Sequence, residues 1–245
     1  MNQLQQTLSS WQDIDEGIYL AKKCYVDIWK PLFLILFIFS TVLLVGASQL
    51  SMYWIILIIW WLKPLYDQLI LKVLSQHVSR ERLTFKALMI FSLKLFFSFD
   101  VLKVLSIRRF SFVRSFLQPI YQLENNSRQK TKERIKVISR GASSRAANLT
   151  FMALLTENII TITFISMLFY ITPAEVRVAL FDNEIVQDQI FIKFITVYMY
   201  IATLLITEPL YVASGFNLYM NKRKRLEAWD IELVFKNLIH RTNHV

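Results

Sequence analysis

Long apolar runs, separated by polar and charged segments, dominate the pattern of the 245-residue chain. Residues 31–47 carry no charge, residues 149–171 are interrupted by Glu157 and Asn158, and residues 189–213 form the last run. A helix needs about 20 mostly apolar residues to cross a bilayer, and about 17 is the short end of that range. The runs therefore predict three membrane-spanning helices.

A further apolar run, residues 52–62, is too short to cross a bilayer alone. Continued through Lys63 and Pro64 to residue 74, it reaches the necessary length. Pro64 lacks the backbone N–H of an ordinary residue, so we expect a kink or helix break there. The pattern favours a fourth span over 52–74, and a re-entrant hairpin over 52–78 is the alternative.

Residues 83–105 are apolar enough to cross a membrane but are also amphipathic. At about 100° per residue, Lys86, Lys94, Asp100 and Lys103 fall within one half of a helix circumference. This segregation predicts a helix that lies at the membrane interface. A span is the alternative.

The two ends of the chain are polar and amphipathic. Residues 1–12 read as a disordered lead-in, and the rest of 1–30 as a helix at the membrane interface. Residues 226–240 predict a second amphipathic helix. The predicted organisation is an N-terminal segment 1–30, a membrane domain 31–213 with a basic cytoplasmic insert 75–148, and a cytoplasmic tail 214–245.

Composition supports an all-α polytopic membrane protein with about four transmembrane helices and additional interfacial helices. Hydrophobic residues make up 55% of the chain, mean hydropathy is +0.40, and four glycines and five prolines leave little turn material. Runs such as 55–59 do not alternate as the strands of a β-barrel would. The first thirty residues show no cleavable signal, and Cys24 has no cysteine to pair with.

Basic residues predict the orientation in the membrane. Of the 28 lysines and arginines, 25 fall in residues 1–30, 72–148 and 214–245. Lysine and arginine accumulate in the cytoplasmic loops of membrane proteins. The pattern predicts a multi-pass protein of the bacterial inner membrane with both termini in the cytoplasm.

The same basic residues form a predicted docking surface. Anionic inner-leaflet lipid is the first expected partner of the run 128–145, and an acidic protein partner is the second. Nucleic acid is disfavoured because the run has no aromatic residue to stack on bases. The predicted surface consists of Arg108, Arg109, Arg114, Arg128, Lys130, Lys132, Arg134, Lys136, Arg140, Arg145, Lys222, Arg223, Lys224 and Arg225.

Four ionisable residues fall inside the predicted spans at similar depth. Because a charge within a bilayer is costly, such side chains face one another or a wet cavity. Lys63 and Asp67 are also i,i+4 neighbours, and Pro64 and Pro209 predict helix breaks beside the charges. We therefore predict one intramembrane cluster of Lys63, Asp67, Glu157 and Glu208.

Three interpretations of the cluster remain open at this point. It locks the helices together, it forms an ion or proton pathway, or it does not assemble. In the third case Glu208 lies at the headgroup boundary and Lys63 extends outward along its aliphatic stem.

Motifs for catalysis or metal binding are absent from the sequence. There is no HExxH, GxSxG, P-loop or dinucleotide fingerprint. The three histidines, His77, His240 and His244, lack metal-ligand spacing. We expect no catalytic residue, no cofactor and no metal site.

Three stretches resemble a family of uncharacterised bacterial inner-membrane proteins. They are Trp60-Trp-Leu-Lys-Pro-Leu-Tyr66, the stretch from Ser111 to Pro119, and the stretch from Glu208 to Arg223 that continues to Leu233. The resemblance implies that the gene for this protein lies near genes for MoxR-type AAA+ ATPases, von Willebrand type A domain proteins and transglutaminase-like membrane proteins. It implies no activity.

Two functions from different classes follow as expectations. The first is a non-enzymatic inner-membrane subunit or scaffold that docks a partner of an envelope-associated system through residues 106–145 and 221–240. The alternative is a small transporter or ion-coupled channel that uses the intramembrane charges. An intramembrane enzyme ranks third, because paired carboxylates alone do not specify a reaction.

Overall fold

The computed structural model describes residues 2–46, 51–79, 84–96, 105, 111–124, 127–173 and 186–227; the side chains of 2–10, 96, 128, 186–191 and 227 are not described. The prediction of an all-helical fold is confirmed for these residues, which contain no strand. Their helices are α1 (Asn2–Lys23), α2 (Tyr25–Gly46), α3 (Met52–Trp61), α4 (Lys63–Ser79), α5 (Phe85–Phe96), α7 (Arg114–Leu123), α8 (Arg128–Ile138), α9 (Ser143–Ile171) and α11 (Val186–Glu227).

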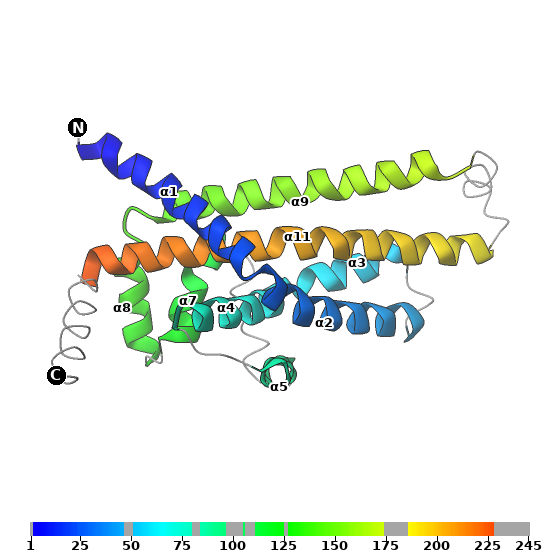
Figure 1. The fold of residues 1–245 in the computed structure, drawn as a ribbon, viewed down its shortest axis with the longest axis horizontal. Coiled ribbons are helices and arrows are strands. Elements are labelled where there is room, and N and C mark those ends of the chain that lie inside the picture. Colours follow the sequence, from blue (N-terminus) through cyan, green and yellow to red (C-terminus); the bar gives the residue numbers. More distant parts are fainter. Residues whose placement is uncertain are drawn as a thin grey trace, which may run out of the picture.

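The 42-residue helix α11 is the axis on which the molecule is assembled (Figure 1). At a rise of about 1.5 Å per residue it is roughly 63 Å long, about twice the hydrocarbon thickness of a bilayer. It packs against α1, α2, α3, α4, α7, α8 and α9. Seven of the eight other helices in the described residues therefore contact this single helix.

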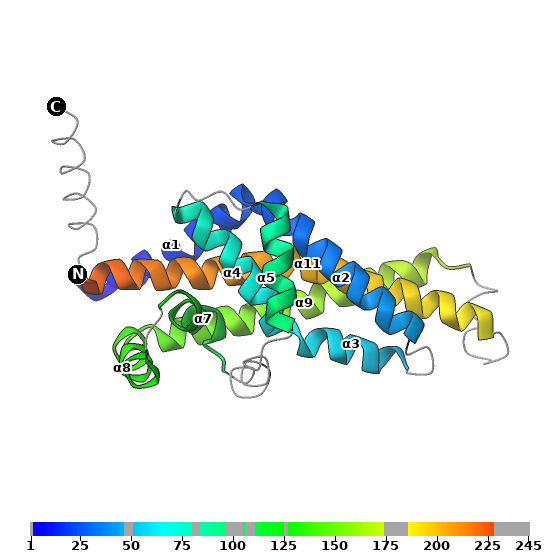
Figure 2. The same ribbon diagram turned by 90° about the horizontal axis from the view of Figure 1, so that it is seen from below.

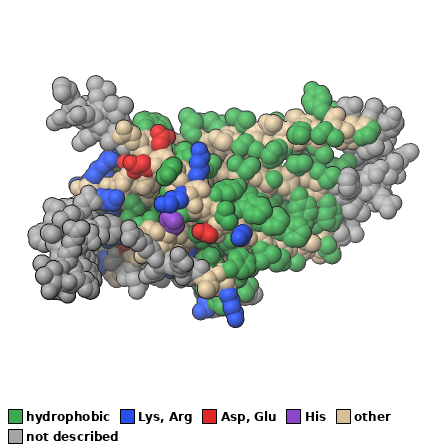
Figure 3. Space-filling view, viewed as in Figure 1, with side chains coloured by type: hydrophobic (Ala, Val, Ile, Leu, Met, Phe, Trp, Pro, Cys, Tyr) green, Lys and Arg blue, Asp and Glu red, His purple; other side chains and the backbone are tan. Residues whose placement is uncertain are grey.

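Polar and apolar parts separate along the long axis of the molecule. Figure 1 shows the end of α2, the start of α3, the end of α9 and the start of α11 at one end, while α1 begins and α11 finishes at the other. On the face drawn in Figure 3, the charged side chains gather toward the end where α1 begins, and hydrophobic side chains cover the opposite part. The end of α2 and the start of α3, like the end of α9 and the start of α11, thus lie at the less charged end of the molecule.

Within the described residues, three helices are long and apolar enough to cross a membrane. They are Tyr25–Gly46, Ser143–Ile171 and the part of α11 from Ile192 to Leu226. Together, α3 and α4 pass the same test as a pair bent by 42°. The predicted number of four is reached only if this bent pair is counted as one span.

The bend falls at Leu62, which separates α3 from α4 (φ −79°, ψ −1°). Pro64 occupies the first turn of α4, where a backbone N–H has no intrahelical acceptor and its absence is tolerated. The hydroxyl of Tyr66 donates to the carbonyl of Ile59 across the bend at 2.9 Å. The chain continues along the long axis instead of turning back as a hairpin would (Figure 1).

Helix α1 packs on the second half of α11. The expectation of a disordered stretch over 1–12 is wrong, because the helix begins at Asn2. Gly17 lies against the backbone of Ser214, where even a methyl group would collide. Asp13 forms an ion pair with Arg225 at 3.0 Å and accepts a hydrogen bond from Asn221 at 2.7 Å. Protein contacts therefore hold this helix, which the sequence alone assigned to the membrane interface.

Helix α5 crosses the bundle. It is seen end-on in Figure 1 and upright in Figure 2, so its axis is nearly perpendicular to α11. Leu88 and Ser92 are buried, whereas Lys86 and Lys94 are exposed. The orientation is that expected of an interfacial helix; Asp100 and Lys103 lie outside the described residues.

The predicted helix break at Pro209 is wrong, because α11 runs through this residue without interruption. The helix also continues past residue 213, the predicted boundary between the membrane domain and the tail. Pro209 is buried within the packed part of α11. Tertiary contacts on α11 offset the loss of one hydrogen bond, which isolated helices tolerate poorly.

Candidate functional site

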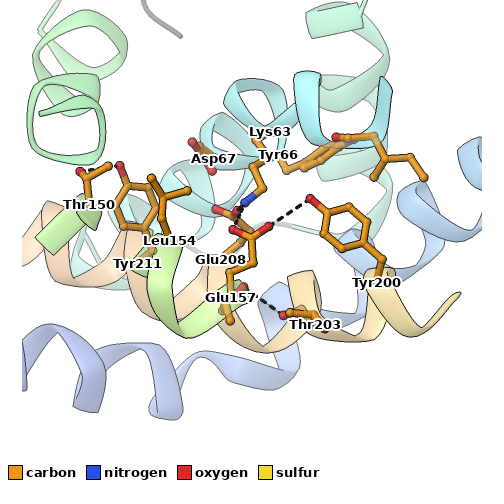
Figure 4. A network of polar contacts seen from close by, with 12 residues as sticks. Lys63, Tyr66, Asp67, Thr150, Leu154, Glu157, Tyr200, Thr203, Glu208 and Tyr211 are labelled. Atoms are coloured by element: carbon orange, nitrogen blue, oxygen red, sulfur yellow. Dashed lines mark hydrogen bonds and ion pairs between the residues drawn. The ribbon is translucent and has the colours of Figure 1, made fainter. Parts of the chain in front are cut away.

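Three helices meet at the ammonium group of Lys63, at the start of α4. Its Nζ donates to Glu157 Oε2 of α9 and forms an ion pair with Glu208 Oε1 of α11 at 2.6 Å (Figure 4). The side chains of all three residues are less than a tenth exposed. One lysine therefore joins two carboxylates from helices that are distant in the sequence.

Glu157 is the main polar anchor of α9. Its second oxygen, Oε1, accepts a hydrogen bond from the hydroxyl of Tyr200 at 3.0 Å. Of the 29 residues in α9, all of which are described, only Ala146 and Glu157 are buried. The rest of this helix presents mostly apolar side chains to the surroundings, so its attachment in the middle depends on Glu157.

Thr150 makes a second connection between α9 and its neighbours. Its hydroxyl lies 2.6 Å from the carbonyl oxygen of Phe112 and 3.1 Å from the hydroxyl of Tyr211. This contact lies about two helical turns before Glu157. Two polar contacts on one side of α9 thus fix its position against α11.

Asp67 lies one turn beyond Lys63 on α4, but its basic partner is Arg114 of α7. Arg114 Nε lies 2.9 Å from Asp67 Oδ2, and the guanidinium group lies over the ring of Tyr211, 5.6 Å from its centroid. The carboxyl groups of Asp67 and Glu208 are also close enough to interact. The structure therefore brings the four residues of the predicted cluster together and adds Arg114.

The position of Arg114 corrects the predicted docking surface. The sequence pattern assigned this residue to an exposed basic segment, but its side chain is only 13% exposed. Helix α7 is strongly amphipathic and buries Ser115, Phe116 and Ile120. This apolar face was the available signal that the start of α7 packs into the bundle.

Tyr200 is a second residue of the site that sequence reasoning missed. It lies about two turns before Glu208 on α11, and its hydroxyl points toward Glu157 (Figure 4). A tyrosine in an apolar run carries no signal of its own, because its position around the helix axis must first be known.

A cavity of about 350 Å³ opens beside the charged residues. Trp60, Lys63, Glu157 and Glu208 contribute to its wall, and a second cavity of about 270 Å³ shares Trp60 and Glu157 with it. Glu157 therefore lines both cavities, the first toward α4, α7 and α11 and the second toward α3 and α11. The remaining residues of the first are Ser111, Phe112, Arg114, Thr150, Ala153, Leu154, Thr207 and Tyr211.

The remaining predicted basic residues divide by their surroundings. Lys130, Lys132, Lys136 and Arg140 are exposed on and just after α8. Arg134 pairs with Glu124 at 2.9 Å, and Arg225 pairs with Asp13. Four more are half-buried: Arg145, Lys222, Arg223 and Lys224. The others lie outside the described residues or side chains: Arg108, Arg109 and Arg128.

No group of three or more histidine, cysteine, aspartate or glutamate side chains suited to a metal ion occurs among the described residues. The chemistry of the site is thus that of paired carboxylates, one ammonium and one guanidinium. Comparison with protein-family models, with curated proteins and with solved structures found no match to the chain. The resemblance carried by the three stretches named above stays a prediction.

Proposed function

We propose that this protein is a four-span inner-membrane subunit or scaffold, without enzymatic activity, that docks an acidic cytoplasmic partner. The observation that carries the proposal is the group of exposed basic residues on and just after α8, at the end of the molecule where α11 finishes.

Membrane insertion is supported by the apolar surfaces of the long helices. Helix α9 exposes Phe151, Ile159 and Ile162 along its length. In water such a continuous apolar surface would favour association or aggregation, whereas in a bilayer it contacts lipid. The 42° bend between α3 and α4 supports one broken span, because α4 continues along the long axis of the molecule after α3 (Figure 1).

Charge supports a cytoplasmic location for the end where α1 begins and α11 finishes. The exposed lysines of α8 lie there, and the C-terminal ends of α2 and α9 lie at the opposite end. Positively charged segments remain on the cytoplasmic side during insertion. Both termini are then cytoplasmic.

Docking is supported by the four exposed basic residues: Lys130, Lys132, Lys136 and Arg140. Lys132 and Lys136 are i,i+4 neighbours and share one face of α8. Arg114, Arg134 and Arg225 pair with acids of this chain, so the exposed four are the ones best placed for a partner. The resemblance favours a component of a MoxR-type ATPase system as that partner.

The buried cluster supports a locking role within this subunit. Lys63 joins α4 to α9 and α11, and Arg114 adds α7. Exact ion-pair geometry in an apolar surrounding restricts helices to one arrangement, which is a known use of buried charges. The lock would hold the basic face of α8 in a constant position relative to the membrane.

A photo-crosslinker at the exposed Gln129 tests the docking proposal in native membranes. We expect a protein adduct that falls by about tenfold when Lys132→Glu and Lys136→Glu are introduced, because electrostatic complementarity speeds association. A crosslinker at Ile162 of α9 is the control and should retain its lipid adducts. Adducts from position 129 that contain lipid alone, or that ignore the charge reversal, would refute the proposal.

A small transporter or ion-coupled channel is a second candidate, favoured by the cavity beside Lys63, Glu157 and Glu208. Glu157→Gln and Glu208→Gln separate the two functions. Loss of function at normal protein abundance favours transport, since a protonatable group would be required. Loss of abundance favours the locking role.

A further inference from the structure

The buried cluster contains more acids than bases. Asp67, Glu157 and Glu208 carry three carboxyl groups, and Lys63 and Arg114 carry two positive charges. All five side chains are buried, with exposed fractions of 13% or less. If every group were ionised, one uncompensated negative charge would remain in an apolar surrounding, which is strongly unfavourable.

Two of the carboxyl groups also have oxygen atoms without a hydrogen-bond donor among the described residues. These are Glu208 Oε2 and both oxygens of Asp67, all buried; of these, Asp67 Oδ2 lies 2.9 Å from Arg114 Nε in an ion pair. The Asp67 side chain is completely buried and that of Glu208 is 4% exposed. The two carboxyl groups lie close enough to interact, and Glu208 lines the 350 Å³ cavity. Both the surplus of charge and the missing donors thus occur at the same pair.

We propose that Asp67 and Glu208 form a proton-binding site, in which the two carboxyl groups share one proton. The proton converts one carboxylate into a carboxylic acid, which donates a hydrogen bond to the other carboxylate. A single proton therefore removes the surplus charge and supplies the missing donor at once. Like-charged carboxyl groups in contact share protons in this way because both cannot ionise without repulsion.

A metal ion fits the site less well than a proton. Divalent cations take about six oxygen ligands, and the described residues contain no group of acids suited to one. A divalent ion would also convert the surplus of one negative charge into a surplus of one positive charge. A monovalent cation would balance the charge but would need more oxygen ligands than the three carboxylate oxygens of the pair that lack donors.

The surroundings allow the shared proton to exchange and hold it in place. Two positively charged groups face the pair: Lys63, which is on α4 like Asp67, and Arg114 on α7. Glu157 of α9 forms the second ion pair of Lys63. The ring of Tyr211 on α11 lies against the guanidinium group of Arg114. The cavity wall includes Glu208, so water that enters the cavity would deliver the proton.

This site is independent of the docking proposal, because its proton satisfies the cluster whether or not α8 binds a partner. If transport were the function, the same pair would be the group that changes protonation. Loss of crosslinking at α8 would therefore leave the proton site untouched, and the converse also holds.

Infrared difference spectroscopy of the purified full-length protein tests the site. At neutral pH we expect one protonated carboxyl band that shifts on transfer to D₂O. Asp67→Asn and Glu208→Gln should each abolish it, because removal of either acid balances the remaining charges. Asp13→Asn is the control and should leave the band unchanged, since Asp13 pairs with Arg225 far along α11.

Two further measurements require no substitution in the site. In protein labelled with ¹³C at the carboxyl carbons of aspartate and glutamate, the carboxyl resonances should include one in the protonated range at neutral pH. Replacement of sodium by potassium or choline at constant ionic strength should leave the melting temperature unchanged. Absence of the band and of the resonance, or a melting temperature that rises with one specific cation, would overturn the proposal in favour of ionised carboxylates or a bound cation.

Discussion

Lys63 shows how one residue stabilises a polar site in apolar surroundings. A single charge in the middle of a membrane helix costs about 2.5–3.5 kcal/mol on insertion scales. The ammonium group contacts Glu157 and Glu208 at once, so each charge lies beside an opposite one. The pairs need not add stability relative to an apolar core, but removal of one member leaves a buried charge alone.

Lys63→Met should therefore destabilise the protein strongly. It removes the cation shared by Glu157 and Glu208, and breaking a buried pair costs about 3–5 kcal/mol. Thermal unfolding in detergent, together with the yield of folded protein, measures the effect. Lys132→Met, at an exposed position of α8, should change stability by less than about 0.5 kcal/mol. Equal melting temperatures for the two variants would contradict the expected role.

Gly17 is the second residue whose identity is dictated by a close contact. A Cβ atom at this position would lie 2.5 Å from Ser214 Cα and 2.8 Å from the carbonyl oxygen of Ala213. Both atoms belong to the backbone of α11 and cannot rotate away. The close approach of α1 to α11 therefore requires glycine on α1.

Gly17→Ala should separate α1 from α11 and lower stability by about 1–3 kcal/mol, the usual cost of overpacking. The melting temperature and the hydrogen exchange of α1 report the change. Gly46→Ala is a matched control because no atom lies within 4 Å of its added Cβ. If the control loses as much stability as Gly17→Ala, the close contact does not determine the effect.

At the scale of elements, the bend between α3 and α4 positions Lys63 for its two partners. A helix break leaves carbonyl groups without their usual N–H partners. The hydroxyl of Tyr66 donates to one of them, the carbonyl of Ile59. The first turn of α4 then begins at Lys63, beside α9 and α11.

Tyr66→Phe should lower stability by about 1–3 kcal/mol, because the buried Ile59 carbonyl loses this donor. Tyr53→Phe is the control, since Tyr53 is exposed near the start of α3. Chemical or thermal unfolding compares the two variants. A smaller loss for Tyr66→Phe than for Tyr53→Phe would mean that the bend does not depend on this hydrogen bond.

At the scale of the whole molecule, the charged and apolar ends are separate, so the side of the membrane on which each end lies can be measured. Replacing the buried Cys24 provides a background without cysteine. A membrane-impermeant thiol reagent added from the outside should label Pro173→Cys and leave Lys94→Cys and Lys130→Cys unlabelled. After membrane permeabilisation, Lys130→Cys should react. Labelling of position 130 from the outside would invert the proposed orientation.

The level of a residue along its helix could be predicted from the sequence, whereas the direction in which its side chain faces could not. The order of apolar runs predicted the helices, and residue counts along each run predicted that Lys63, Asp67, Glu157 and Glu208 lie at a common level. Both inferences follow from the constant rise per residue of a helix. They require no knowledge of which helices touch.

The sequence by itself determined the helical class, the lengths of the apolar segments and the levels at which charges occur, because hydrophobicity and rise act along one chain direction. Only the tertiary structure decided which side chains face each other. It turned Arg114 inward to Asp67, carried α11 straight through Pro209 and packed α1 on α11. Rotation about a helix axis and the choice of neighbours depend on packing between distant segments, which the linear pattern does not contain.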